Sequence, residues 1–142
     1  MAEVKLITDG AKLDQLLRSP AGPTGLFLIG QATRFQVAAR ATLAPHRDTG
    51  CLEDGIVKRL EESGGAIAVR VLTDTVPCSP TRTAYGLYVH DGTDPHEIRP
   101  KQAGGVLAFQ VGGETVFARS VQHPGTKAVR FFTDNRAVLS AY

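Results

Sequence analysis

Histidines beside carboxylates are the first side chains in this sequence that could do chemistry. Two of the four histidines, His90 and His96, lie in the stretch HDGTDPH together with two aspartates. Imidazole and carboxylate groups suit zinc or manganese, so a small metal-dependent enzyme would use His90, Asp91, His96 and His123. The same stretch contains Gly, Thr and Pro, which form turns for backbone reasons. We therefore favour a turn here and keep the metal-dependent enzyme as the alternative.

The second candidate for chemistry is HPGTK, residues 123–127. A phosphate-binding P-loop requires G-x-x-x-x-G-K-[ST], and no glycine stands at the required distance before Gly125. Pro124 and Gly125 instead predict a type II turn, in which glycine takes the positive φ. Ser120 and His123 suggest a nucleophile and a base, but no third group that would orient the base is identifiable. The sequence therefore predicts a protein that is not an enzyme and that needs no cofactor or metal.

The composition limits the classes of protein to which the chain can belong. Hydrophobic residues make up 42% and charged residues 21% of the 142 residues, which is ordinary for one globular domain over 1–142. A net charge of +2 is too small for a protein that coats nucleic acid. No apolar run approaches the roughly 20 residues of a membrane helix, and the start MAEVKLITDG does not resemble a secretory signal. We expect a product of the cytosol, or one assembled there, with no membrane partner.

The two cysteines, Cys51 and Cys78, do not show the short paired spacing of a zinc site. A structural disulfide is uncommon in a reducing compartment. The sequence therefore predicts two free, partly buried thiols.

Two amphipathic helices are expected before residue 45. Residues 9–18 form the first, with Leu13, Leu16 and Leu17 directed inward. Residues 26–44 form the second. Its inward stripe consists of Leu28, Ala32, Phe35, Ala39 and Leu43. Its opposite side is small and apolar (Leu26, Gly30, Val37, Ala41 and Ala44), and it packs either on the protein's own sheet, which we favour, or on another subunit.

A third helix is expected over residues 51–62, with Thr49 or Asp48 as its cap. Asp54 and Lys58 would pair on its solvent side. SGG at residues 63–65 would end it.

From residue 66 the hydrophobic period changes to two, which is typical of strands. Strands are expected over 66–72, over 84–93, and in a hairpin formed by 106–111 and 115–121 with GGE at 112–114 as its turn. Leu107, Phe109 and Val111 would share one face of this hairpin with Phe117 and Val121. A short helix capped by Thr133 or Asp134 would end the chain.

The order of these elements predicts an α+β fold. N-terminal helices would pack on one face of an antiparallel sheet of about four strands, and a short helix would follow at the C-terminus.

Three segments also resemble one known family, in the family's order. They are APHRDTGCLEDGI (44–56), YGLYVHDGTDPHEIRPKQAGGVLAF (85–109) and VFARSVQHPGTKAVRFF (116–132). These segments are similar to the tail-completion, or head–tail joining, family of long-tailed bacteriophages, which includes the minor tail protein Z of lambda-like phages. Residues 1–40 match no motif of the family.

The resemblance implies a structural virion protein of the phage neck, assembled in the host cytoplasm. Such proteins form or join a homo-oligomeric ring between the head connector or stopper and the tail terminator or tube. DNA passes through the lumen without sequence-specific binding. A tail terminator that caps the tail tube is the alternative within this class. The family brings no catalytic residue, so the polar turns would serve as subunit contacts: Asp91, Gly92, Thr93, His96, Arg99, His123, Pro124, Gly125, Thr126 and Lys127.

Overall fold

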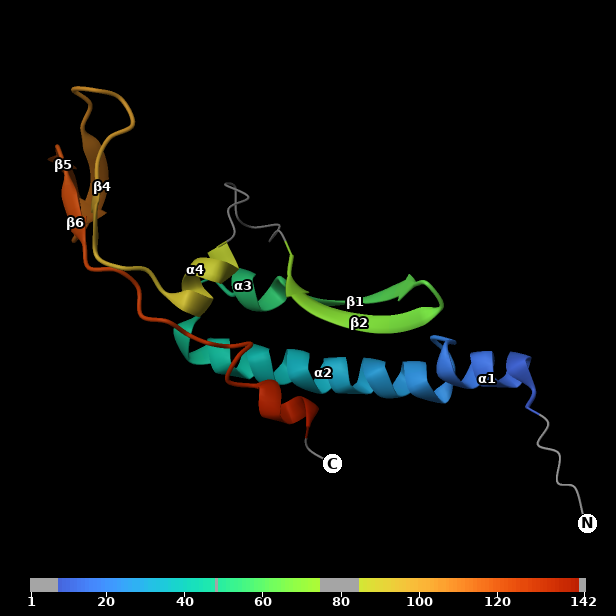
Figure 1. Cartoon of the computed structure of the whole chain (residues 1–142). Coiled ribbons are helices and arrows are strands. Elements are labelled where there is room, and N and C mark those ends of the chain that lie inside the picture. Colours follow the sequence, from blue (N-terminus) through green and yellow to red (C-terminus); the bar gives the residue numbers. More distant parts are fainter. Residues whose placement is uncertain (1–7, 48, 75–84, 141–142) are drawn as a thin grey trace, which may run out of the picture. The chain divides into compact units, whose positions relative to one another are not determined.

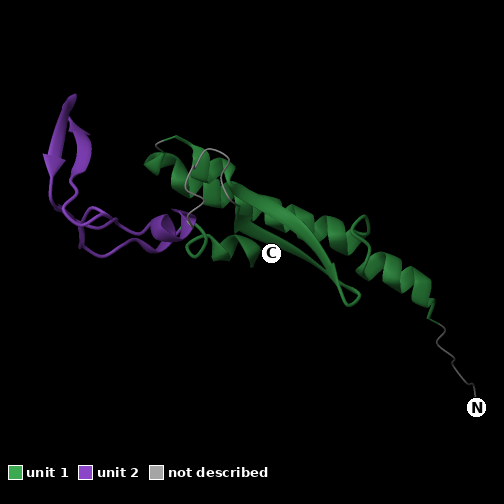
Figure 2. Ribbon diagram, turned by 90° about the horizontal axis from the view of Figure 1, so that it is seen from above, with its two compact units in different colours: residues 1–84, 131–142 green, residues 85–130 purple. Residues whose placement is uncertain are grey.

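The structure, a computed structural model, describes residues 8–47, 49–74 and 85–140 (Figure 1). The chain forms two compact units (Figure 2). Unit 1 consists of residues 1–84 and 131–142, and unit 2 consists of residues 85–130. The α+β class is confirmed. The strands form three separate two-stranded antiparallel sheets, where the sequence predicted one sheet of about four strands.

Unit 1 is built around one long helix. It contains α1 (Gly10–Leu17), α2 (Pro23–Leu43), η1 (Ala44–His46), α3 (Cys51–Asp54), β1 (Ile56–Ser63), β2 (Ala66–Thr73) and η2 (Arg136–Leu139). The β1–β2 hairpin lies along α2, and η2 lies beside the same helix (Figure 1). No helix in the described part of the chain is long and apolar enough to cross a membrane.

The core of unit 1 follows the predicted stripe of α2. Ala32, Phe35, Ala39 and Leu43 are buried, and Leu52, Ile56 and Phe131 complete the core from other elements. The Phe35 ring stacks on Phe132 with the ring centroids 5.7 Å apart. Two side chains of α2 also hold the start of β1. Gln36 Nε2 donates to the Ile56 carbonyl at 2.7 Å, and Arg40 Nη2 donates to the same oxygen at 2.9 Å.

The other side of α2 does not pack on the protein's own sheet, contrary to the favoured expectation. Leu26, Gly30, Val37, Ala41 and Ala44 are all exposed. The inward placement of Leu13, Leu16 and Leu17 on α1 is also wrong, because α1 contains no buried residue. The helix itself is confirmed, and Asp9 caps it by accepting from the Ala11 and Lys12 N–H groups.

The helix expected over 51–62 is wrong beyond its first turn. α3 ends at Asp54 and β1 begins at Ile56. Gly64 and Gly65, with φ of 58° and 77°, form the two-residue turn that joins β1 to β2, a turn type that needs positive φ at both positions. Lys58 consequently does not pair with Asp54, and its Nζ lies 2.5 Å from Thr33 Oγ1.

Two local expectations around α3 have separate outcomes. The N-cap of α3 is Gly50, so Thr49 is not the cap that was expected. Thr49 Oγ1 accepts from the Cys51 N–H at 3.4 Å, and Asp48 lies outside the described residues. Cys51 is disulfide-bonded, which corrects the prediction of a free thiol there. Cys78 also lies outside the described residues.

Unit 2 contains α4 (Tyr85–Asp91), β3 (His96–Ile98), β4 (Leu107–Val111), β5 (Glu114–Ala118) and β6 (Val121–His123). The strand expected over 84–93 is wrong, since this segment forms α4. Tyr85, Leu87 and Val89 alternate as a strand would, but Tyr85, Tyr88 and Val89 also fit the spacing of one helix face. A segment this short does not distinguish the two periods.

The β4–β5 hairpin is confirmed, but its facial assignment is partly wrong. The turn consists of Gly112 and Gly113 alone, and Glu114 is already paired with Val111. The sequence analysis placed Glu114 in the turn and so shifted β5 by one residue, which moves each side chain to the opposite face. Phe117 therefore lies opposite Ala108, on the other face from Phe109. Val121 belongs to β6 and pairs with Ile98.

The C-terminal element is a 3-10 turn, η2, preceded by Asn135. Thr133 and Asp134 are therefore not its cap. Asn135 Nδ2 instead donates to Thr42 Oγ1 and to the Phe131 carbonyl, each at 2.8 Å. The bond to Thr42 holds the chain end against α2, and the bond to Phe131 lies within the C-terminal segment.

Candidate functional site

A short ladder in unit 2 joins the two polar segments that the sequence analysis selected. β3 pairs with β6 so that His96 lies opposite His123 and Ile98 lies opposite Val121. A separate bridge joins Thr93 and Thr126, whose N–H and carbonyl groups exchange two hydrogen bonds of 3.0 Å. This pairing has no local signal in the sequence, because each strand has only three residues. The structure thus places the predicted residues from both segments in one site.

Two glycines hold the site at close range. Gly125 has φ of 85°, and a Cβ on it would lie 2.2 Å from the Thr93 carbonyl oxygen. Gly92 has φ of 75°, and a Cβ there would lie 2.5 Å from the Thr126 carbonyl oxygen. Each glycine therefore contacts the backbone of the other segment at a distance that no residue with a side chain allows. The Thr93 hydroxyl adds a third bond by accepting from the Thr126 N–H at 3.0 Å.

The histidines of the ladder are occupied with the backbone and with each other. The His96 and His123 rings stack with centroids 5.0 Å apart. Gly125 N–H donates to His123 Nδ1 at 3.1 Å, and His96 Nδ1 lies 2.8 Å from the Asp94 carbonyl oxygen. These bonds require His123 to carry its proton on Nε2 and His96 to carry its proton on Nδ1. The pattern fixes the orientation of both rings and uses the Nδ1 atom of each.

The alternative metal site is not assembled. His90 Nδ1 pairs with its neighbour Asp91 Oδ1 at 2.6 Å, whereas His96 and His123 face each other on the ladder. Over residues 8–47, 49–74 and 85–140, no group of three or more His, Cys, Asp or Glu side chains is placed to hold a metal ion. His46, the fourth histidine, is exposed in η1.

Arg99 is engaged within its own segment. Its Nη2 and Nε atoms lie 2.6 and 2.8 Å from Glu97 Oε2. Hydrogen bonds from Arg99 and then Ser120 hold the pKa of the Glu97 carboxyl below its ordinary value of 4.5, and Glu97 in turn raises the pKa of Arg99. Asp91, Pro124 and Lys127 are also exposed around the ladder, and of these Asp91 pairs with His90. Lys127 is therefore better placed than Arg99 for a contact with another chain.

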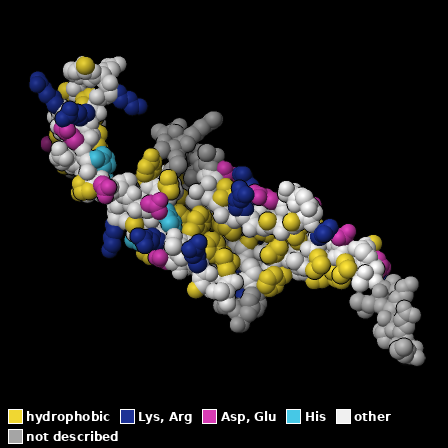
Figure 3. Space-filling model, viewed as in Figure 1, with side chains coloured by type: hydrophobic (Ala, Val, Ile, Leu, Met, Phe, Trp, Pro, Cys, Tyr) yellow, Lys and Arg dark blue, Asp and Glu magenta, His cyan; other side chains and the backbone are white. Residues whose placement is uncertain are grey.

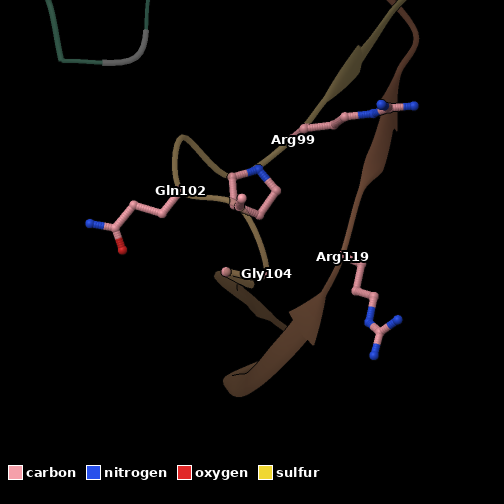
Figure 4. Close-up of a pocket in the computed structure, with 7 residues that line it drawn as sticks. Arg99, Gln102, Gly104 and Arg119 are labelled. Carbon is pink, nitrogen blue, oxygen red and sulfur yellow. The ribbon is translucent and has the colours of Figure 1, made fainter.

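A hollow of about 460 Å³ lies beside the ladder in unit 2. The loop over residues 99–105 and Arg119 line it (Figure 4). Its two guanidinium groups could attract an anion, but Glu97 already balances the charge of Arg99. Figure 4 also shows the Gln102 side chain pointing away from Arg119, so the polar groups do not converge on one point.

The apolar side chains of unit 2 are the feature that the sequence analysis missed. None of the hydrophobic side chains over residues 85–130 is buried. Phe109, Val116 and Phe117 are exposed on the β4–β5 hairpin, and Phe117 is the most exposed of them at 66%. Alternating hydrophobicity indicated a strand with one covered face, but the pattern does not say which surface covers it.

No protein-family model matches this chain, and neither a curated protein nor a solved structure matches it.

Proposed function

We propose that the chain is a non-enzymatic structural protein of the tailed-bacteriophage neck. In this role it forms or joins a homo-oligomeric ring between the head connector or stopper and the tail terminator or tube. DNA passes through the lumen of the ring without sequence-specific binding. The resemblance of residues 44–56, 85–109 and 116–132 to the tail-completion family is the starting point of the proposal.

The β3–β6 ladder is the structural observation that most strongly supports the proposal. Two of the three family-like segments meet there, and their glycines, threonines and histidines serve backbone geometry. A catalytic site would need a nucleophile, a base and an orienting group within reach of one another. The ladder instead supplies a rigid polar corner, rimmed by exposed Asp91 and Lys127, of the kind that seats a neighbouring subunit.

The uncovered apolar surface of unit 2 also supports an assembly role. A two-stranded hairpin is marginal in water unless further strands or a helix cover it. The β4–β5 hairpin exposes hydrophobic side chains on both faces, so a partner surface would stabilise it. In a closed ring, each subunit offers two different patches, and closure multiplies modest contacts through effective concentration.

A nonsense mutation in the gene, made in the phage that encodes the chain, tests this function. Electron microscopy of the lysate should show full heads and finished tails that remain separate, and added purified protein should join them. A tail terminator would be revealed by tubes of irregular length. Normal infectious particles that lack the chain would contradict both neck functions.

A further inference from the structure

The two histidines of the β3–β6 ladder can each gain a proton, a property that the proposed function does not use. His96 is exposed and His123 is half-buried, and histidine side chains are visible at the surface of unit 2 in Figure 3. Histidine is the side chain whose charge changes most readily near neutral pH. The two rings are stacked with their centroids 5.0 Å apart, so a charge on one ring acts directly on the other.

His96 can accept a second proton without losing a hydrogen bond. Its Nδ1 lies 2.8 Å from the Asp94 carbonyl oxygen and therefore already donates. The added proton goes to Nε2, and the bond to Asp94 stays in place. A charged donor also makes a stronger hydrogen bond than a neutral one. The first proton that the pair takes up therefore belongs on His96 and leaves the ladder closed.

His123 cannot accept a second proton while the ladder is closed. Its Nδ1 accepts from the Gly125 N–H at 3.1 Å, whereas a charged imidazole carries a proton on both nitrogens and has no acceptor. Protonation would place two N–H groups against each other and leave the half-buried Gly125 N–H without its acceptor. It would also add a second positive charge to the stack with His96. Both effects oppose a proton on His123.

The turn that depends on His123 also positions the Thr93–Thr126 bridge. Gly125 lies so close to this bridge that a Cβ on it would be 2.2 Å from the Thr93 carbonyl oxygen. The next residue, Thr126, exchanges two backbone hydrogen bonds of 3.0 Å with Thr93. Loss of the bond between His123 and Gly125 therefore frees the turn that holds Thr126 opposite Thr93.

The surroundings of the two rings balance one added charge but not two. The described contacts of the rings are a backbone N–H, a backbone carbonyl and each other. The next pair on the same face of the ladder, Ile98 with Val121, is apolar, and Glu97 lies on the opposite face. The charged and titratable side chains of the segments that flank the ladder are His90, Asp91, Asp94, Arg99, Arg119 and Lys127.

These flanking charges are mostly paired or positive. Asp91 pairs with His90, and Arg99 pairs with Glu97. Within the flanking segments, Asp94 is then the carboxylate that can balance a proton on His96. Arg119 and Lys127 carry the same charge as a protonated ring and oppose a second proton.

We propose that the β3–β6 ladder is an acid-sensitive element that closes at neutral pH and opens when His123 is protonated. The closed ladder holds one added proton, on His96, and the open ladder holds a proton on each ring. Because the open form binds more protons, lowering the pH shifts the equilibrium towards it. Opening removes the polar corner that the Thr93–Thr126 bridge forms. The inference concerns the isolated chain and goes beyond the neck function.

Amide hydrogen exchange in the full-length protein tests this inference. Protection of the Thr126 N–H, corrected for the intrinsic exchange rate at each pH, should fall about tenfold between about pH 7.5 and about pH 5, where histidine gains its proton. This range stays above 4.5, and the pKa of the Glu97 carboxyl is lower than that value, so Glu97 does not contribute.

His123→Asn is the matched variant. An asparagine Oδ1 accepts from the N–H two residues further along the chain, as His123 Nδ1 does, but it does not gain a proton in this range. Protection at Thr126 in His123→Asn should therefore change by less than about twofold over the same range, although His46, His90 and His96 are still present.

Two exchange results would overturn the inference. One is an equal decrease of protection in the wild type and in His123→Asn, which would assign the acid response to another group. The other is wild-type protection at Thr126 that stays constant over the whole range.

Nitrogen NMR of the histidine rings gives a second measurement that needs no substitution. As the pH is lowered, His96 should take up its proton first, while His123 Nδ1 stays unprotonated and the Thr126 N–H stays protected. His123 should become charged only as this protection is lost. A charged His123 ring in a ladder that still protects Thr126 would contradict the proposal.

Discussion

Gly125→Ala is the substitution that most directly tests whether the polar ladder is held by backbone geometry. A methyl group at this position would lie 2.2 Å from the Thr93 carbonyl oxygen, whereas ordinary contact begins near 3.4 Å. The same oxygen accepts from the Thr126 N–H at 3.0 Å. The backbone must therefore move by about 1.2 Å, and both hydrogen bonds of the Thr93–Thr126 bridge open.

The loss of stability in Gly125→Ala has two parts. An alanine at a φ of 85° loses about 1–2 kcal/mol relative to glycine. The two bridge bonds contribute about 1 kcal/mol each. We expect the Gly125→Ala ladder to be less stable by about 3 kcal/mol, or more where the clash is not relieved.

Gly113→Ala is the matched control. Gly113 lies in the same unit with φ of 90°, and a Cβ there would meet nothing within 4 Å. The Gly113→Ala variant should lose only the stability that an alanine loses at a positive φ, about 1–2 kcal/mol. Amide hydrogen exchange measures the difference, because the Thr126 N–H exchanges when the ladder opens. Exchange at Thr126 should be about 30-fold faster in Gly125→Ala than in Gly113→Ala, corresponding to about 2 kcal/mol. Similar exchange rates in the two variants would refute the argument from close packing.

Three further predictions concern stability. Gln31→Leu removes a buried oxygen that has no donor, so the isolated protein should gain about 1–2 kcal/mol in urea unfolding; a loss would show that the oxygen is satisfied. The Glu97 carboxyl has a lowered pKa when folded, so its contribution is present above 4.5 and is lost as the pH falls through the lower folded value. Amide protection at Gln122 should therefore decrease as the pH falls below 4.5 in the wild type and decrease less in Glu97→Gln, and equal decreases would argue against the Arg99 pair. On α2, Val37 is exposed, so Val37→Ser should change the free energy of unfolding by less than about 0.5 kcal/mol. Ala39 is fully buried, so Ala39→Leu should lower the free energy of unfolding by about 1–3 kcal/mol. The reverse order of the two effects would contradict the assigned core face of α2.

The sequence predicted the elements whose signal is local and long. The stripe of α2 repeats over several turns, and four of its five predicted members are buried. The β4–β5 hairpin is also found from its glycines. The length of its turn was less certain from the sequence, and one residue too many placed Phe117 on the wrong face.

Elements that depend on distant partners could not be predicted in this way. The hydrophobic pattern of residues 56–62 fits a helix, but these residues form a strand because they pair with β2. β3 and β6 have three residues each and are stabilised by each other, across more than 20 intervening residues. Gln31 did give a readable signal, because a polar residue at this position interrupts the apolar stripe between Leu28 and Phe35. The resemblance selected the residues of the ladder, but their contacts with one another required the structure.

Cryo-electron microscopy of purified virions is the measurement that tests the neck function most directly. The account predicts a ring of density between portal and tail tube into which α2, the β1–β2 hairpin and the β3–β6 ladder can be built with this chain's side chains. A fully traced neck in which every ring is built from other polypeptides would contradict it.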